Sequence, residues 1–92
     1  MKPLPRLSGK ETLILELLCN TTEMYGLEMV KVSRGRLKRG TIYVTLNRME
    51  EKGYIDSYEG EDGKRLYKVT GHGSRVLAAW QAAGAVFAGV SI

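Results

Sequence analysis

The sequence predicts a mainly α-helical domain that also contains one small β-hairpin. Three observations lead to this fold class. Apolar residues recur at helical spacing before residue 53 and again after residue 70. Between these regions, two short stretches rich in aromatic and branched residues flank an Asp-Gly pair, which is a strong signal for a hairpin turn. A chain of 92 residues has the length of one domain.

The first helix is expected over residues 9–20. Ser8 precedes it and Glu11 lies three residues further on, which is the pattern of a capping box. Cys19, the only cysteine, ends the apolar run, and we expect it to be a small core residue rather than a redox switch. Four apolar residues recur at the spacing of one helix face, namely Leu13, Ile14, Leu17 and Leu18.

A short second helix is expected over residues 25–33. Leu27 and Val30 should face the core, and Met29 is a third candidate for a buried position. The Ser33-Arg34-Gly35 stretch should end this helix, because serine and glycine favour turns.

The third helix is expected over residues 40–52. Ile42, Leu46 and Met49 fall at i, i+4 and i+7, which is the spacing of a buried stripe. Gly53 follows, and a glycine at this position commonly ends a helix in the left-handed conformation.

Two short strands are expected over residues 54–58 and 65–69, joined by the glycine-rich turn of residues 60–64. Three helices followed by a two-stranded hairpin form the winged helix-turn-helix arrangement. In that arrangement the third helix is the recognition helix and the hairpin is the wing.

A last, very apolar helix is expected to begin after Thr70, which caps it, and to run to about residue 90. A membrane span is disfavoured because the run is short, consists mostly of Ala, Gly and Val, and contains Gln81. Apolar residues follow one another at the 4, 3, 4, 3 spacing typical of a coiled-coil seam, from Val76 through Trp80, Ala83 and Phe87 to Val90, with Leu77 and Gly84 beside them.

We expect these seven residues to form the interface of a homodimer, because one small domain cannot cover a helix that is apolar on all sides. The alternative is that the helix packs back on its own domain. We accordingly expect two parts in one compact unit. Residues 1–70 should form a winged helix-turn-helix DNA-binding domain, and residues 71–92 should form a C-terminal dimerisation helix.

Basic charge is concentrated before the third helix. The chain has a formal net charge of +4, and residues 31–40 contain five basic side chains and no acidic one. Residues 11–30, by contrast, contain four glutamates and no basic residue. A basic cluster beside a recognition helix is typical of a surface that binds DNA phosphates.

The third helix offers side chains that can read bases. Thr41, Thr45, Arg48 and Lys52 share one face, with Val44 beside them. Arginine can bind guanine in a bidentate manner, and threonine or valine can contact a thymine methyl group. We expect the DNA-binding residues to be Arg34, Arg36, Lys38, Arg39, Thr41, Val44, Thr45 and Arg48, together with Lys64 and Arg65 of the wing.

Three alternatives remain open. The polar face of the third helix could be an ordinary solvated surface, or it could dock a protein partner instead of DNA. The wing could be a plain hairpin, because Glu59, Glu61 and Asp62 crowd its turn and weaken any grip on phosphates.

No motif predicts an enzyme, a metal site or a cofactor. The chain has no glycine-rich phosphate loop, serine elbow or metal-ligand spacing, and His72, the single histidine, is expected at the surface. A single cysteine indicates a reducing compartment. The first ten residues lack the apolar segment of a signal peptide, so we expect a cytoplasmic protein.

An ordered set of short motifs between about Leu7 and Leu77 resembles the PadR-like transcriptional regulators. The motifs are Tyr25-Gly26, Gly40-Thr41-Ile42-Tyr43, Leu46 through Glu50 to Gly53, and Tyr67-Lys68-Val69-Thr70 followed by Gly73 and Leu77. The sequence departs from the family pattern at Met24, where a histidine is common, and at Val44, where a proline commonly follows the tyrosine.

The resemblance implies a dimeric winged-helix repressor of a pseudo-palindromic operator, with the third helix in the major groove. It also implies that Tyr43 lies near the DNA backbone and that the C-terminal helix forms the dimer interface. A small lipophilic or phenolic effector is a further implication of the resemblance.

Overall fold

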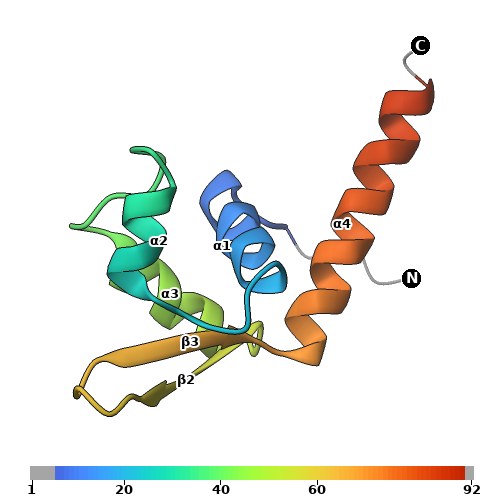
Figure 1. Cartoon of the computed structure of the whole chain (residues 1–92). Helices are drawn as coiled ribbons and strands as arrows, with labels where there is room; N and C mark the ends of the chain where they lie inside the picture. The colour runs from blue at the N-terminus through green and yellow to red at the C-terminus, as the bar shows by residue number, and fades with distance from the viewer. Residues whose placement is uncertain (1–5, 91–92) are drawn as a thin grey trace.

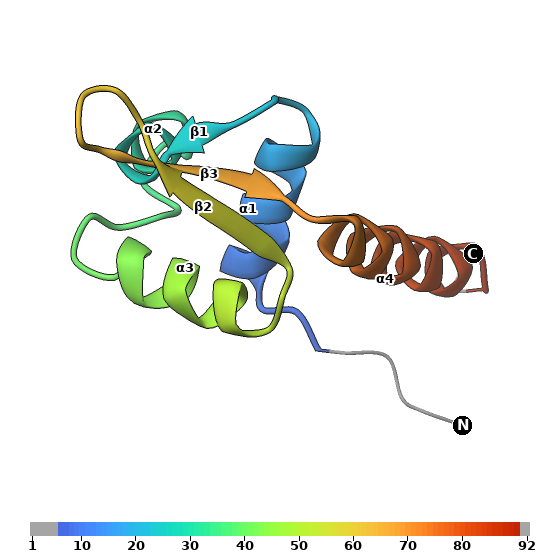
Figure 2. The same ribbon diagram turned by 90° about the horizontal axis from the view of Figure 1, so that it is seen from below.

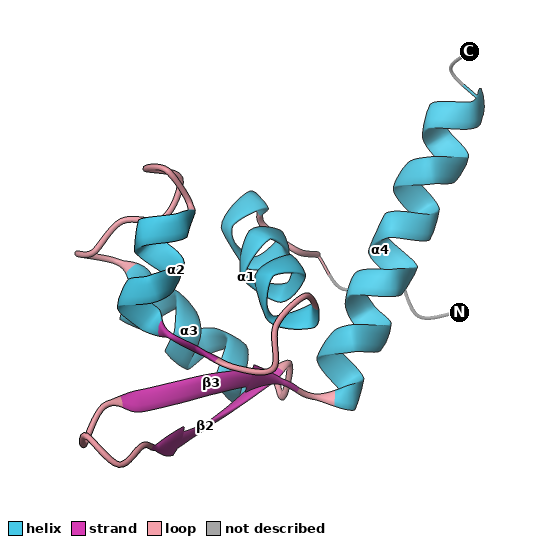
Figure 3. Cartoon of the chain, in the orientation of Figure 1, coloured by secondary structure: helices cyan, strands magenta, loops and turns pink. Residues whose placement is uncertain are grey.

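The structure, a computed structural model, describes residues 6–90, and it describes side chains for residues 6–83. The predicted helices and strands follow one another in the expected order, with one further short strand, and the mainly helical fold with a small hairpin is confirmed (Figures 1 and 3). Their bounds are α1 Gly9–Cys19, β1 Met24–Tyr25, α2 Gly26–Val32, α3 Ile42–Glu51, β2 Ile55–Glu59, β3 Arg65–Val69 and α4 Gly71–Val90.

The capping box at the start of α1 is confirmed. The Glu11 amide donates to Ser8 Oγ at 3.1 Å, and the Ser8 amide donates to Glu11 Oε1 at 3.0 Å. The expected core position of Cys19 is wrong, because its side chain is exposed. Cys19 is the last residue of α1 and lies roughly 100° around the helix from the buried Leu18, so it points past the edge of the core.

A strand that the sequence patterns do not predict, β1, adds a third member to the sheet. Met24 pairs with Tyr67 and Tyr25 with Leu66, so the strand order is β1-β3-β2 (Figure 2). Two residues are too few to show the alternation by which a strand is recognised in a sequence.

The second helix buries a different face from the one expected. Met29 is fully buried and Val30 is half-buried, whereas Leu27 is 42% exposed and its expected core position is wrong. Gly26 and Met29 share the buried face of α2, whereas Leu27 lies roughly 200° around the helix from Met29 and faces outward.

The core forms where α1 packs against α3, β3 and α4. The predicted stripe of Ile42, Leu46 and Met49 is confirmed, since all three side chains are buried in this core. Gly53 ends the α3 segment with a φ of +79°, as expected for a left-handed helix stop.

The predicted hairpin is confirmed, with Ile55 opposite Val69 and Glu59 opposite Arg65. In its turn the Gly63 amide donates to the Gly60 carbonyl at 3.0 Å, and Gly63 has a φ of +79°. A turn that ends in a left-handed glycine is a common solution for hairpin loops longer than two residues.

Hydrogen bonds and close packing join the start of α4 to the start of the wing. The Thr70 hydroxyl accepts a hydrogen bond from the Gly73 amide at 2.9 Å and donates one to the Gly53 carbonyl at 2.6 Å. Gly73 sits so close to the wing that a Cβ there would lie 2.0 Å from the Tyr54 carbonyl oxygen. From this anchor α4 extends beyond the rest of the domain (Figure 1). None of the helices in the described part of the chain combines the length and apolarity of a membrane span.

Candidate nucleic-acid interface

The loop between α2 and α3 holds its basic side chains outward. Buried Ser33 organises it, because its hydroxyl donates to the Val30 carbonyl at 2.7 Å and accepts from the Leu37 amide at 2.9 Å. Leu37 is buried and anchors the middle of the loop. Arg34 and Gly35 have φ values of 54° and 88°, a left-handed turn that is uncommon for a residue other than glycine. The exposed side chains of this basic loop are Arg34, Arg36, Lys38 and Arg39.

The outermost line of α3 differs from the face that the sequence patterns favour. At about 100° per residue, Val44, Asn47 and Glu51 lie opposite the buried stripe, with Arg48 beside them, and all four side chains are exposed. Asn47 is absent from the expected set although asparagine can bind adenine in a bidentate manner. Counting outward from the buried stripe would have identified it.

Expected residues of α3, including two from its outer line, also line a groove between this helix and the first turn of α1. We call it the α1 groove, and it has a volume of about 370 Å3. It brings together four predicted residues, Thr41, Val44, Thr45 and Arg48, and places them opposite Ser8 and Lys10.

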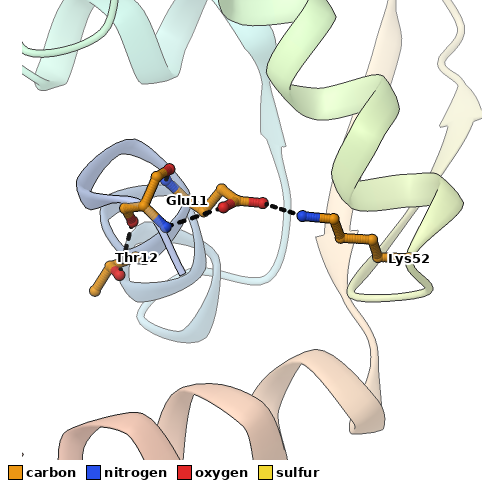
Figure 4. A network of polar contacts seen from close by, with 4 residues as sticks. Glu11, Thr12 and Lys52 are labelled. Atoms are coloured by element: carbon orange, nitrogen blue, oxygen red, sulfur yellow. Dashed lines mark hydrogen bonds and ion pairs between the residues drawn. The ribbon is translucent and has the colours of Figure 1, made fainter. Parts of the chain in front are cut away.

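Lys52, at the end of the same face, is held by an ion pair. Its Nζ lies 3.1 Å from Glu11 Oε2, with side-chain exposures of 46% for Lys52 and 11% for Glu11 (Figure 4). Burial alone would raise the pKa of the Glu11 carboxyl, but the Ser8 amide and the Lys52 ammonium outweigh it and hold that pKa below its usual value. In this structure the Lys52 ammonium is therefore paired with the Glu11 carboxylate of α1.

Tyr43 and the wing residues meet on the opposite side of α3. Tyr43, Lys64 and Arg65 line a second hollow of about 270 Å3 together with Tyr25, Leu27 and Glu28, and we call it the wing pocket. The Tyr43 ring packs over Gly26, where a Cβ would lie 2.9 Å from Tyr43 Cε1. A glycine at this position therefore allows the close approach of α2 and α3.

The wing is tied to α3 through Ser57. Arg65 Nη1 donates to Ser57 Oγ at 2.9 Å, and the Ser57 hydroxyl donates to Glu50 Oε1 at 2.8 Å. The wing is also joined to the segment before β1, because the Tyr58 hydroxyl donates a hydrogen bond to Glu23, and this bond raises the pKa of Tyr58. The network fixes the orientation of Arg65 relative to the recognition helix.

The residues expected at a dimer interface fall into three groups. Val76 and Leu77 are only 7% and 5% exposed, because they pack into the core of their own chain. Trp80 and Ala83 are half-buried. Gly84, Phe87 and Val90 lie outside the residues whose side chains the structure describes.

The model of the PadR-like family of transcriptional regulators matches residues 14–79. A PadR family transcription regulator from Clostridium difficile R20291 has 32% sequence identity and a TM-score of 0.74, over 87% of this chain and 91% of that one. A transcriptional regulator from Clostridium thermocellum has 26% identity and a TM-score of 0.73, over 92% of this chain and 94% of that one.

A mutant of MarR from E. coli, solved in complex with operator DNA, shares the fold alone. It has 17% identity and a TM-score of 0.70, over 79% of this chain and 52% of that one. Among curated protein sequences, none matches the chain at a significant level. The family match spans most of the chain and agrees with the fold and with the solved relatives, and the chain therefore belongs to the PadR-like family of transcriptional regulators.

Proposed function

We propose that the chain is a sequence-specific repressor that binds a pseudo-palindromic operator as a homodimer. The observation that carries the proposal is the outer surface of α3, which presents Val44, Asn47 and Arg48 side by side. A branched methyl pair suits a thymine methyl group, an amide suits adenine, and a guanidinium suits guanine. The basic loop beside this surface would supply phosphate contacts, which add affinity on any sequence.

The homodimer is supported by the course of α4. The helix packs on its own domain through Val76 and Leu77 and then continues to Val90 beyond the three-helix body (Figure 1). Its last third is an apolar sequence, and an apolar helix that extends from a small domain favours a second copy as its partner. Two copies related by a two-fold axis would present two α3 helices to two half-sites.

In this proposal Tyr43 contacts the sugar–phosphate backbone of the DNA. Tyr43 is 44% exposed and lines the wing pocket with Lys64 and Arg65, so an aromatic side chain and two cations face the same space. A deoxyribose could pack on the ring while an adjacent phosphate accepts hydrogen bonds from the cations. We include a small lipophilic or phenolic effector because of family membership alone, and release of bound DNA by such compounds would test it.

The proposal is tested by selection from a pool of random duplexes with the full chain. We expect an enriched inverted repeat whose half-site centres lie about 10 base pairs, or a multiple of one turn, apart. We also expect retention on heparin until well above 0.2 M salt, because several phosphate-binding side chains act together. Failure to enrich any sequence, together with early elution from heparin, would instead favour a winged helix that docks a protein partner.

A further inference from the structure

Two hollows flank α3, one on each side. The α1 groove lies toward Thr45 and Arg48, and the wing pocket lies toward Tyr43. Thr45 and Tyr43 are two residues apart, which places their side chains roughly 200° apart around the helix. The recognition helix is therefore bordered by a concave surface on both sides.

An α-helix fills the DNA major groove almost from side to side. An α-helix with its side chains is about 10–12 Å across, and the major groove is about 12 Å wide. A helix that fills the groove has a sugar–phosphate strand along each of its sides. The wing pocket accounts for one strand with Lys64 and Arg65, which leaves the other strand for the α1 groove.

The far wall of the α1 groove is formed by Ser8, Lys10 and Glu11, and it contributes one cation, Lys10. Lys10, in the first turn of α1, is exposed and lines this groove opposite Arg48. It also lines an adjoining hollow with Arg36 of the basic loop, so the two cations lie on a continuous surface. Within the described residues the structure contains one ion pair, between Lys52 and Glu11, so Lys10 and Arg36 keep their charge available.

We propose that the first turn of α1 is a second wall of the DNA interface, in which Lys10, beside Arg36, binds phosphates of the strand that borders α3 on the side away from the wing. This inference rests on the proposed function, since it assumes that α3 lies in the major groove. It assigns to Lys10 a role that the recognition helix, the loop and the wing do not fill. Glu11, the acidic neighbour of Lys10, does not oppose it strongly, because Lys52 neutralises that carboxylate.

The test compares Lys10→Ala with Arg75→Ala in the full chain. Arg75 is an exposed cation on α4 and lines neither hollow, so its replacement removes the same charge elsewhere. Dissociation constants are measured between 0.05 and 0.3 M salt on the selected operator and on a random duplex. For Lys10→Ala we expect the salt slope to fall by about 0.9 per bound subunit and affinity at 0.15 M salt to fall about fivefold, equally on both duplexes. Lys10→Arg should restore both values, because arginine also binds phosphate.

Ethylation interference locates the contact. Ethylation of phosphates on one strand beside each half-site should weaken DNA binding by the wild-type protein. The same modifications should not affect DNA binding by the Lys10→Ala variant. In one outcome the wild type binds its operator while Lys10→Ala matches Arg75→Ala in salt slope and interference pattern. In that case the proposed phosphate contact of Lys10 is wrong and the proposed function stands. If the wild type binds no duplex at all, both proposals fail.

Discussion

Lys52 Nζ lies 3.1 Å from Glu11 Oε2, and this ion pair ties the end of α3 to the first turn of α1 (Figure 4). The same carboxylate closes the capping box through its other oxygen, which accepts from the Ser8 amide. One side chain therefore fixes the start of α1 and also withholds a cation of the recognition helix from any partner. The cation is released if the pair is broken without loss of the cap.

Glu11→Gln separates these two roles. Glutamine can keep the capping hydrogen bond, because its side-chain oxygen accepts as glutamate does, but it no longer neutralises Lys52. We expect DNA binding to become more salt-dependent, by up to about 0.9 in slope per subunit, because Lys52 becomes available for a phosphate. Lys52→Met in the same background should remove the gain, and an unchanged slope in Glu11→Gln would show that Lys52 cannot reach DNA.

The same variant should change how stability depends on pH. The folded-state pKa of Glu11 lies below its ordinary value of 4.5, so this carboxylate stabilises the fold above that pH. Its contribution is lost as the pH falls through the folded-state pKa, which makes the wild type lose stability below about pH 4.5. Urea unfolding at pH 7 and at several lower pH values should show a steeper decline for the wild type than for Glu11→Gln. Parallel curves would mean that Glu11 has the same pKa in the folded and unfolded chains.

The basic loop should supply affinity without specificity. Lys38 and Arg39 are exposed beside the start of α3, where phosphates would pass. Replacing both with alanine should flatten the salt slope by about 1.8 per subunit, since each phosphate contact contributes about 0.9. The loss should be equal on operator and random duplexes, and a loss confined to the operator would make these side chains base contacts.

Arg48 should supply specificity. It is exposed at the border between the outer line of α3 and the α1 groove, within reach of base edges if α3 lies in the major groove. Arg48→Ala should relax the preference at one base position and cost about 1–3 kcal/mol on the operator, with a much smaller effect on random DNA. Binding measured on operators with single base-pair substitutions shows whether Arg48 contacts a base or a phosphate. Loss of a phosphate contact would weaken binding to all sequences alike.

The sequence predicts the fold because its strongest patterns coincide with what the core requires. Ile42, Leu46 and Met49 repeat at helical spacing since they are buried together, and Gly53 stops their helix with a positive φ. The failures are local. Leu27 is as apolar as its buried neighbours, and only the packing of α2 through Gly26 and Met29 shows that it faces outward.

The candidate interface was predictable in composition rather than in arrangement. The patterns identify Thr41, Thr45 and Arg48, and the structure gathers them in one groove. They could not reveal that Lys10 lies opposite them or that Lys52 is paired with Glu11, because both facts depend on how α1 packs against α3. Contacts between distant segments leave no periodic signal in a single sequence.

The dimer should depend on the last third of α4. Val76 and Leu77 already pack in the core of their own chain, so removal of the whole helix would unfold the domain and could not isolate the interface. A chain that ends at Ala83 keeps these contacts and the half-buried Trp80, whose fluorescence then reports whether the domain is still folded. We expect the full chain to sediment as a dimer at micromolar concentration and the shortened chain as a monomer. Operator binding should weaken about 100-fold or more, because two linked half-sites gain this much from simultaneous engagement. A shortened chain that remains dimeric would place the interface elsewhere, and a full chain that is monomeric would contradict the homodimer itself.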